Sequence, residues 1–253
     1  MQAKFVEWDI SMVSLSKCVE AKVHRSSLSE ELGQVAYVLS DKTGTLTQNQ
    51  MVFRQMSISG VSYGKNEREC EDAASKEVTN FNMVDSDLKK KIKNQSDDQY
   101  EQIQRFLYHL ALCHTVLTCN NPKDEAIKPL LSSASPDELA LLNAAKYYGI
   151  KFVERNDRNE LVIENNHHQQ SQLYKYELLN VIEFKSERKR MTVIVKEPNG
   201  QIKVLCKGAD SVLVPLLSDT WQNQEVKEKT MEHLHQYAKD GLRTLLICER
   251  SIS

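Results

Sequence analysis

Short runs in which apolar residues alternate with polar ones fill the stretch from residue 150 to residue 206. A period of two predicts β-strands that have one buried face. The expected strands cover 150–153, 161–163, 174–184, 191–195 and 202–206. Asn199-Gly200, between the last two runs, is typical of a tight hairpin turn. We therefore expect a mainly antiparallel sheet in this part of the chain.

Other segments show the three- to four-residue spacing of amphipathic helices. Apolar residues recur at this spacing from Tyr100 to Leu117, and again from Pro136 to Tyr148, where Gly149 ends the helix. A further helix is expected at about 222–239, followed by a last strand at 243–248. These helices would flank the antiparallel sheet, which makes the second half an α+β arrangement.

The first hundred residues give weaker patterns. The run 35–39 (Val-Ala-Tyr-Val-Leu) is short, β-branched and aromatic, so it predicts a buried strand. A second β-like run covers 51–58 and ends at Ser59-Gly60. Residues 64–98 are highly polar and lack apolar periodicity, and we expect them to form a solvated, partly disordered insertion.

The first of these strands is followed, after Ser40, by Asp41-Lys42-Thr43-Gly44-Thr45-Leu46-Thr47. The carboxyl ends of parallel strands are where α/β proteins bind ligands. An aspartate at such a place can attack phosphorus and form an aspartyl-phosphate. Lys42 would bring charge to the phosphoryl oxygens, Thr43 a hydroxyl and a backbone carbonyl, and Gly44 close backbone approach. Any three of these residues would indicate a plain turn, but the whole string indicates a nucleophile at Asp41.

Composition limits the possible partners. The chain has 253 residues, 40% of them hydrophobic, and a formal net charge of −2. This is typical of a soluble globular chain and argues against nucleic-acid binding. The six cysteines are scattered without a C-x-x-C pair, which favours reduced thiols. No run approaches the roughly 20 apolar residues of a membrane helix, and residues 1–20 lack the apolar core of a signal peptide.

Two motifs in the second half have competing interpretations. Ser135-Pro136-Asp137-Glu138 has the form of a helix capping box, so the local pattern favours a structural role for Glu138. The block 183–192 places Phe184 beside Arg188-Lys189-Arg190. An aromatic ring there can stack on a purine while the cations meet phosphates. The alternatives are a core aromatic on a strand and a solvated basic edge.

Two further motifs lie at expected strand ends. Lys207-Gly208-Ala209-Asp210 follows the strand that ends at Cys206, and the glycine leaves room beside the lysine for a nucleotide. Arg243 lies in Gly241-Leu242-Arg243-Thr244-Leu245, where it would otherwise be a surface arginine.

Taken together, these blocks carry a resemblance. The string 41–47 matches the phosphorylation signature of the P-type ATPases, and the blocks at 29–35, 110–116, 135–141, 183–192 and 207–210 resemble, in order, the type IV branch, the phospholipid flippases. The usual flippase form has alanine where this chain has Ser135. Asp210 stands where cation pumps have proline, which weighs against a cation pump.

The resemblance implies an organisation. Residues 1–28 would be the end of the fourth membrane helix and the stalk, and 29–52 the first segment of a haloacid-dehalogenase-like phosphorylation domain. Residues 53–253 would form the nucleotide-binding domain. The full-length parent would be a multi-pass membrane translocase with this segment on the cytoplasmic side. It would move a phospholipid between leaflets, together with an accessory glycoprotein subunit.

The resemblance also implies roles for single residues. Asp41 would take the γ-phosphoryl of ATP, and Mg²⁺ would bridge the phosphate, Asp41 and the Thr43 backbone, with Lys42 beside them. In the nucleotide-binding domain the implied contacts are Glu138 facing the adenine ring, Phe184 stacking on it, Lys207 touching the nucleotide and Arg243 reaching its phosphates.

Two alternatives remain. A soluble aspartate-based phosphatase would explain Asp41, but its second aspartate would stand at Thr43. A non-catalytic nucleotide-binding module would explain the second half alone. The sequence holds neither a Thr-Gly-Glu loop nor an Asp-Gly-x-Asn-Asp motif, so we expect the isolated, soluble chain to bind ATP without multiple turnovers.

Overall fold

A computed structural model describes residues 2–14, 19–25, 31–64, 78–119, 130–132, 135–167, 171–218 and 221–252. The chain divides into two compact units, Met1–Asn49 and Gln50–Ser253. Within the described ranges, no helix combines the length and the apolar character needed to cross a membrane.

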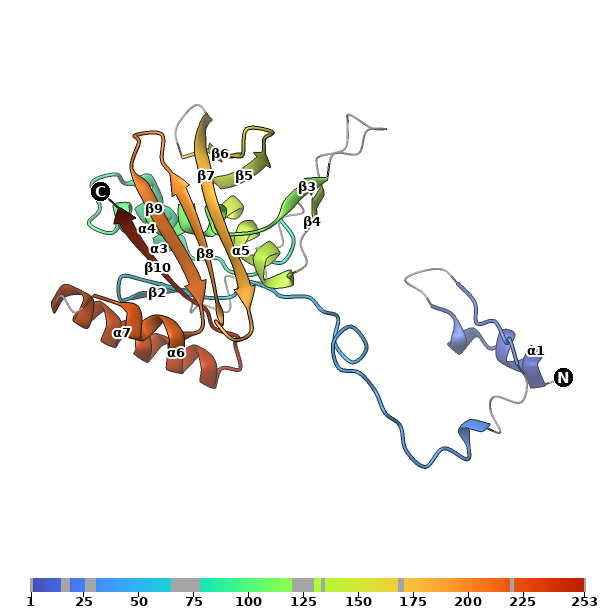
Figure 1. Ribbon diagram of the computed structural model, residues 1–253. Helices are drawn as coiled ribbons and strands as arrows, with labels where there is room; N and C mark the ends of the chain where they lie inside the picture. Colours follow the sequence, from blue (N-terminus) through green and yellow to red (C-terminus); the bar gives the residue numbers. More distant parts are fainter. Residues whose placement is uncertain are drawn as a thin grey trace. The chain divides into compact units, whose positions relative to one another are not determined.

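A six-stranded antiparallel sheet forms the centre of the second unit (Figure 1). Its strands are β5 (Ile150–Arg155), β6 (Glu160–Asn165), β7 (Gln172–Lys185), β8 (Arg190–Lys196), β9 (Ile202–Gly208) and β10 (Leu246–Ile252). They lie in the order β10-β9-β8-β7-β6-β5. This confirms the predicted antiparallel sheet and the hairpin at Asn199-Gly200, where Gly200 has φ +89°. The last strand begins at Leu246, three residues later than expected.

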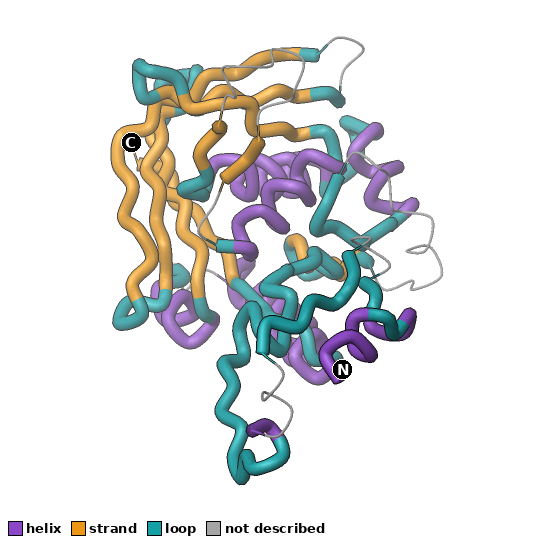
Figure 2. The backbone as a smooth tube through the Cα atoms, turned by 90° about the vertical axis from the view of Figure 1, so that its right-hand side faces the viewer, coloured by secondary structure: helices purple, strands orange, loops and turns teal. Residues whose placement is uncertain are grey.

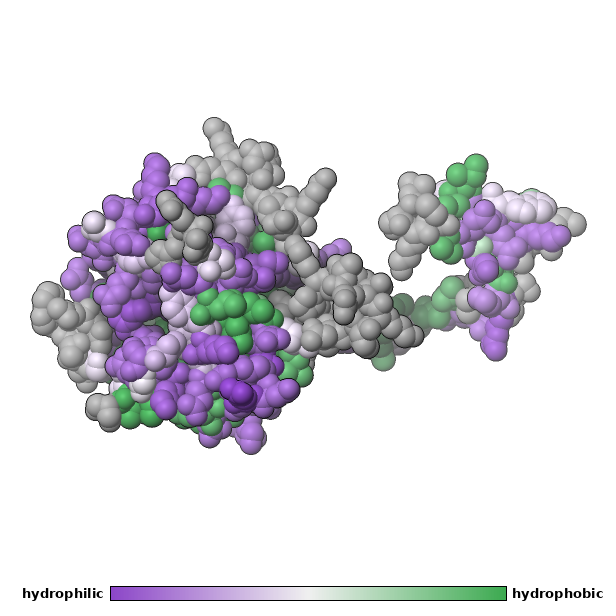
Figure 3. All heavy atoms as spheres, turned by 90° about the horizontal axis from the view of Figure 1, so that it is seen from above, coloured by the Kyte–Doolittle hydropathy of each residue, from purple (hydrophilic) through white to green (hydrophobic). Residues whose placement is uncertain are grey.

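Two long helices pack against one face of the sheet (Figure 2). They are α4 (Tyr100–Leu112) and α5 (Pro136–Tyr147), and both confirm predicted helices, although α4 ends five residues before its predicted end at Leu117. Between them and the strands lie fully buried side chains such as Ile103, Leu107, Val193 and Val195. Burial of each such side chain contributes about 1.5–3 kcal/mol, which makes this layer the main source of stability. The face seen in Figure 3 is, by contrast, largely hydrophilic.

Shorter elements complete the second unit. β1 (Met56–Ile58) and β2 (Val61–Tyr63) form a hairpin whose two-residue turn, Ser59-Gly60, has positive φ at both positions, as a type I′ turn requires. α7 (Trp221–Lys239), predicted at 222–239, is tied to this hairpin because the Tyr237 hydroxyl donates to the carbonyl of Met56 at 3.0 Å. The remaining elements are α3 (Ser86–Lys93), β3 (Leu117–Cys119), β4 (Leu130–Ser132), α6 (Asp210–Leu213) and η4 (Val214–Leu216).

The first unit contains α1 (Gln2–Glu7) and η1 (Ile10–Met12), and the strand predicted at 35–39 is absent from it. Residues 35–40 have no regular structure, and Leu39 is 97% exposed. The prediction was wrong because a strand needs a neighbour, and the described part of this unit supplies only the isolated bridges Ser14–Val19 and Thr43–Thr47.

The polar segment 64–98 contains a helix that its sequence pattern did not predict, among the residues that the structure describes. α3 lies within it, capped by Asp85, whose carboxylate accepts from the Leu88 amide at 2.9 Å. Leu88 and Ile92, four residues apart, are 0% and 7% exposed and enter the core. Residues 78–98 are therefore part of the folded unit. The rest of the predicted insertion, 65–77, lies outside the described residues.

Candidate functional site

Four strands terminate together at one end of the sheet. Lys185 at the end of β7 pairs with Arg190 at the start of β8, and Arg190 pairs with Gly208 at the end of β9. Gly208 in turn pairs with Leu246 at the start of β10. Neighbouring strands lie about 4.8 Å apart, so this row spans about 14 Å. The antiparallel topology thus gathers motifs that lie far apart in the sequence at this end of the strands, which is referred to as the exposed edge.

Phe184 lies on this edge, in the irregular step where the register of β7 on β8 shifts between Ile182 and Lys185. Its side chain is 60% exposed, so the alternative interpretation as a core aromatic is wrong. The turn 186–189 follows, with Lys189 at φ +48°, and leads into Arg190. An exposed ring next to a basic turn provides both a stacking surface and positive charge.

Gly208 is required by the close approach of two backbone segments. A Cβ atom at this position would lie 2.5 Å from the carbonyl oxygen of Lys189 and 2.7 Å from the Cβ of Arg190. The Ala209 amide donates to the same Lys189 carbonyl at 3.0 Å. The basic turn therefore fills the space that the missing side chain of Gly208 leaves. The hydrogen bond from Ala209 holds this turn against the end of β9.

Lys207 and Glu138 form a buried ion pair that joins β9 to the first turn of α5. The Nζ of Lys207 donates to Glu138 Oε1 at 2.9 Å, and the two side chains are 9% and 7% exposed. The other carboxylate oxygen accepts from the amide and the hydroxyl of Thr115 at 3.2 and 2.9 Å. Burial favours the protonated acid, but the Lys207 charge and these hydrogen bonds hold the pKa of Glu138 below its ordinary value.

The capping-box interpretation of this helix start receives limited support. Ser135 is the N-cap, with extended backbone, and Pro136 occupies the first turn, but the Ser135 side chain does not make the capping hydrogen bond. The Glu138 carboxylate instead points to Thr115 and Lys207. Thr115 was missed by sequence reasoning, because nothing in its surroundings signals a contact 23 residues away.

Two buried histidines near Lys207 remain neutral. Burial, and then the Lys207 charge, lowers the pKa of His109 to about 3 and that of His114 to about 4. The His114 ring accepts from the Val116 amide through Nδ1 and lies 2.9 Å from the Ala111 carbonyl through Nε2, so Nε2 carries the proton. The charges behind this edge are therefore those of the Lys207–Glu138 pair, which cancel.

Arg243 brings a second ion pair to the same helix start. Its guanidinium lies 3.2 Å from the Asp137 carboxylate, and its own side chain is 63% exposed. It belongs to the segment 242–245, which leads into β10. Asp137 and Glu138 thus connect the N-terminus of α5 to β10 and β9, and most of the Arg243 side chain stays open to solvent.

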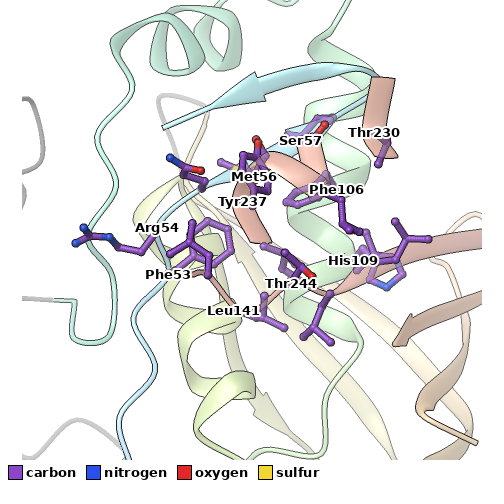
Figure 4. Close-up of a pocket in the computed structure, with 18 of the residues that line it drawn as sticks. Phe53, Arg54, Met56, Ser57, Phe106, His109, Leu141, Thr230, Tyr237 and Thr244 are labelled. Carbon is purple, nitrogen blue, oxygen red and sulfur yellow. The ribbon is translucent and has the colours of Figure 1, made fainter. Parts of the chain in front are cut away.

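A cavity of about 560 Å³ adjoins this second ion pair (Figure 4). Phe106 and His109 of α4, Leu141 of α5 and Tyr237 of α7 line it, and Figure 4 shows them converging. Asp137 and Arg243 also line it, whereas Glu138, Phe184 and Lys207 do not. The cavity is therefore a neighbour of the exposed edge and not the place where the sequence motifs meet.

The predicted nucleophile lies in the first unit. Asp41 is exposed, and one of its carboxylate oxygens accepts from the Lys42 amide at 2.8 Å. The Lys42 carbonyl accepts from the amides of Leu46 and Thr47 at 3.0 and 3.1 Å, which closes the loop, and Gly44 has φ +82°. The motif is thus a self-contained turn that presents the aspartate to solvent.

Comparison with known proteins assigns the chain to a family. Residues 102–253 match the family described as P-type ATPase, cytoplasmic domain N. The chain is 37% identical to phospholipid-transporting ATPase IC of Xenopus tropicalis over 262 residues, covering 100% of the chain and 20% of that protein.

Two further relatives agree with this assignment. Phospholipid-transporting ATPase DRS2 of Saccharomyces cerevisiae is 41% identical over 254 residues, with 100% of the chain and 18% of that protein covered. Human phospholipid-transporting ATPase ID is 36% identical over 262 residues, with 98% and 20% covered. The chain thus spans about a fifth of the length of these relatives. It belongs to the P-type ATPases, and its relatives are phospholipid-transporting members of that family.

Proposed function

We propose that the second unit binds ATP at the edge where β7, β8, β9 and β10 end or begin, and that the parent protein transfers the γ-phosphoryl to Asp41 to move a phospholipid between leaflets. The observation that carries the proposal is the row Lys185–Arg190–Gly208–Leu246, which brings an exposed aromatic, a basic turn and two ion pairs to one edge. The ring suits stacking on a purine, and the basic side chains suit hydrogen bonds to phosphate oxygens.

Each side chain has a role that follows from its position. Phe184, with an exposed ring, stacks on the purine. The Lys207–Glu138 pair is buried, with 9% and 7% of its side chains exposed, and would meet the purine edge through that exposed part. Arg243, with most of its side chain in solvent, reaches the phosphates. The Lys207–Glu138 pair contributes no net charge, so attraction for the triphosphate comes from Arg243 and the basic turn.

In the transfer step a carboxylate oxygen of Asp41 attacks the γ-phosphorus. The bond between this phosphorus and the bridging oxygen breaks, and ADP leaves with the electron pair. Lys42 stabilises the charge on the phosphoryl oxygens. The oxygen donors of Asp41 and of the Thr43 backbone suit Mg²⁺, which takes one or two protein oxygens together with phosphate and water, and which supplies charge neutralisation when bound.

Thr43 governs the fate of the phosphorylated aspartate. A threonine has no basic group that could activate water at neutral pH, so the acyl phosphate is expected to persist once formed. This persistence distinguishes an ATP-driven transporter, which couples phosphorylation to movement, from a soluble phosphatase. The match of residues 102–253 to the cytoplasmic domain N of P-type ATPases favours the transporter. A non-catalytic module is the remaining alternative.

The proposal is tested by calorimetric titration of the chain with ATP. Phe184→Ala removes the stacking ring, which is worth about 1–3 kcal/mol per base, and is expected to weaken binding about tenfold or more. Leu173→Ala is the matched control, because Leu173, at the far end of β7, is 65% exposed and Phe184 is 60% exposed. Equal affinities for the two variants would contradict the proposed edge.

Lipid identity and an accessory glycoprotein subunit belong to the parent protein and stay proposals.

A second assay separates the alternatives for Asp41. A soluble phosphatase would release phosphate from a generic phosphomonoester such as p-nitrophenyl phosphate, and Asp41→Asn would abolish that release. We expect no release above the Asp41→Asn control. ATP binding without any radiolabel on Asp41 in the full-length parent would support the non-catalytic module instead.

A further inference from the structure

Cys206 and Cys248 face each other across the last two strands of the sheet. They are direct partners in the antiparallel register of β9 and β10. Directly paired residues have Cα atoms about 4.5–5.5 Å apart, which falls within the range of about 4.4–6.8 Å that a disulfide accepts. Both are free thiols in this structure, and their side chains are in hydrogen-bond contact.

The two sulfurs have unequal surroundings. Cys206 Sγ accepts from the Cys248 thiol and, at 3.3 Å, from the Thr192 hydroxyl. The charges of Arg190 and Arg188 also favour a thiolate at Cys206. The Cys248 hydrogen bond, together with the hydroxyl and these guanidinium groups, lowers the pKa of Cys206 to about 6. Cys248 donates that hydrogen bond, which together with burial raises its pKa.

This inequality divides the two steps of disulfide formation between the two residues. A thiolate is the nucleophile toward oxidants, so Cys206 reacts first. Cys248 keeps its proton and lies within contact, which is the position of a resolving thiol. Cys113 provides a contrast, because burial is the largest influence on its thiol and raises its pKa to about 12, whereas the hydrogen bond from Cys248 is the largest influence on Cys206.

We propose that Cys206 and Cys248 are a reversible dithiol–disulfide pair, closed by oxidants of the peroxide class. The Cys206 sulfur attacks one peroxide oxygen, the O–O bond breaks, and the leaving hydroxide takes a proton to become water. The Cys248 sulfur then attacks the sulfur of the Cys206 sulfenic acid. The S–O bond breaks, and hydroxide leaves with the Cys248 proton as a second water. The two thiols are oxidised to one disulfide, and the peroxide is reduced to two waters.

The place of this pair in the fold gives the disulfide a structural effect. Cys206 directly precedes Lys207, and Cys248 directly follows Ile247, the strand partner of Lys207. The bond would therefore fasten β9 to β10 one residue from the Lys207–Glu138 ion pair. It would also close a loop of about 40 residues that contains α7, which restricts the unfolded chain and raises the melting temperature.

The experiment treats the folded chain with hydrogen peroxide, stops the reaction with catalase, blocks free thiols by alkylation and maps the tryptic peptides by mass spectrometry. The expected product joins peptide 204–207 (VLCK) to peptide 244–250 (TLLICER), with the mass of two hydrogen atoms lost. A dithiol reductant should restore both peptides. The melting temperature should be higher before reduction than after it.

Two variants make the result decisive. In Cys248→Ala the resolving thiol is gone, so Cys206 should accumulate as a sulfenic acid that dimedone traps, and no linked peptide should form. Cys113→Ala should still form the link. Circular dichroism shows whether each variant is folded, and Cys248→Ser replaces the alanine variant if that one is not. Absence of the linked peptide in the wild-type chain, or a link from Cys206 to any other cysteine, would overturn the proposal.

Discussion

Removal of one partner of the Lys207–Glu138 pair provides a quantitative test of the site. Lys207→Met keeps the length of the side chain but leaves the Glu138 carboxylate as a buried charge without its ammonium partner, while the two hydrogen bonds from Thr115 remain. Breaking a buried pair in this way costs about 3–5 kcal/mol. The two Thr115 bonds remain, so we expect about 3 kcal/mol. For a unit of some 200 residues this lowers the melting temperature on the order of 10 °C.

The pH dependence follows from the direction of the Glu138 pKa shift. The folded-state pKa is depressed, so the ionised carboxylate stabilises the wild-type fold above the ordinary value of 4.5. That stabilisation is lost as the pH falls through the depressed folded value. In Lys207→Met, burial instead raises the pKa of Glu138. The deficit of the variant should therefore be largest at pH 7 and shrink as the carboxyl group gains a proton at acid pH.

Urea denaturation followed by circular dichroism, at pH 7 and pH 5, measures both effects. Glu138→Gln combined with Lys207→Met removes both charges, and this double variant should recover at least about 1 kcal/mol relative to Lys207→Met alone. A loss below about 1 kcal/mol at pH 7 for Lys207→Met would refute the reasoning. So would a deficit that does not change with pH.

Three further predictions follow from other parts of the structure. Arg243→Ala should weaken ATP binding about tenfold but leave adenosine binding unchanged. Arg250→Ala, at an exposed arginine on β10, the strand that follows Arg243, should change neither in titration calorimetry. Gly208→Ala should destabilise the fold by about 1–3 kcal/mol, because its Cβ would meet the Lys189 carbonyl at 2.5 Å; an unchanged urea midpoint would contradict this. Asp41→Asn in the full-length parent should abolish radiolabelling by γ-labelled ATP while ATP affinity persists, and residual label would assign the acceptor elsewhere.

The fold was predictable where the determining interactions are local. The strands from 150 to 206 alternate in apolar character and are joined by hairpins, so each pairs with its neighbour in the sequence. The segment 35–39 has equally suitable residues, but the residues of its own unit that the structure describes offer it no partner strand. α3 was missed because only Leu88 and Ile92 supply its apolar face, among four lysines between 89 and 93, although Asp85 offered a capping signal.

The site was predictable only in part. Motifs identified Glu138, Phe184, Lys207 and Arg243, but not which of them touch one another. Glu138 and Lys207 are 69 residues apart in the sequence, and their contact depends on how α5 packs on the sheet. A sequence shows residue types at strand ends, whereas ion pairs between distant elements depend on register and packing.

The register of β9 also determines where the chain can accept an inserted or deleted residue. Side chains of successive residues in a strand point to opposite faces of the sheet. Cys206 therefore lies on the face where it meets its strand partner Cys248, and Lys207 lies on the opposite face, where it binds Glu138. An extra residue in the turn 197–201 would be absorbed as loop. An extra residue within 202–206 would exchange the two faces and offer a thiol to Glu138 in place of an ammonium. Insertions or deletions of an odd number of residues within this strand would therefore disrupt the site, whatever side chains they add or remove.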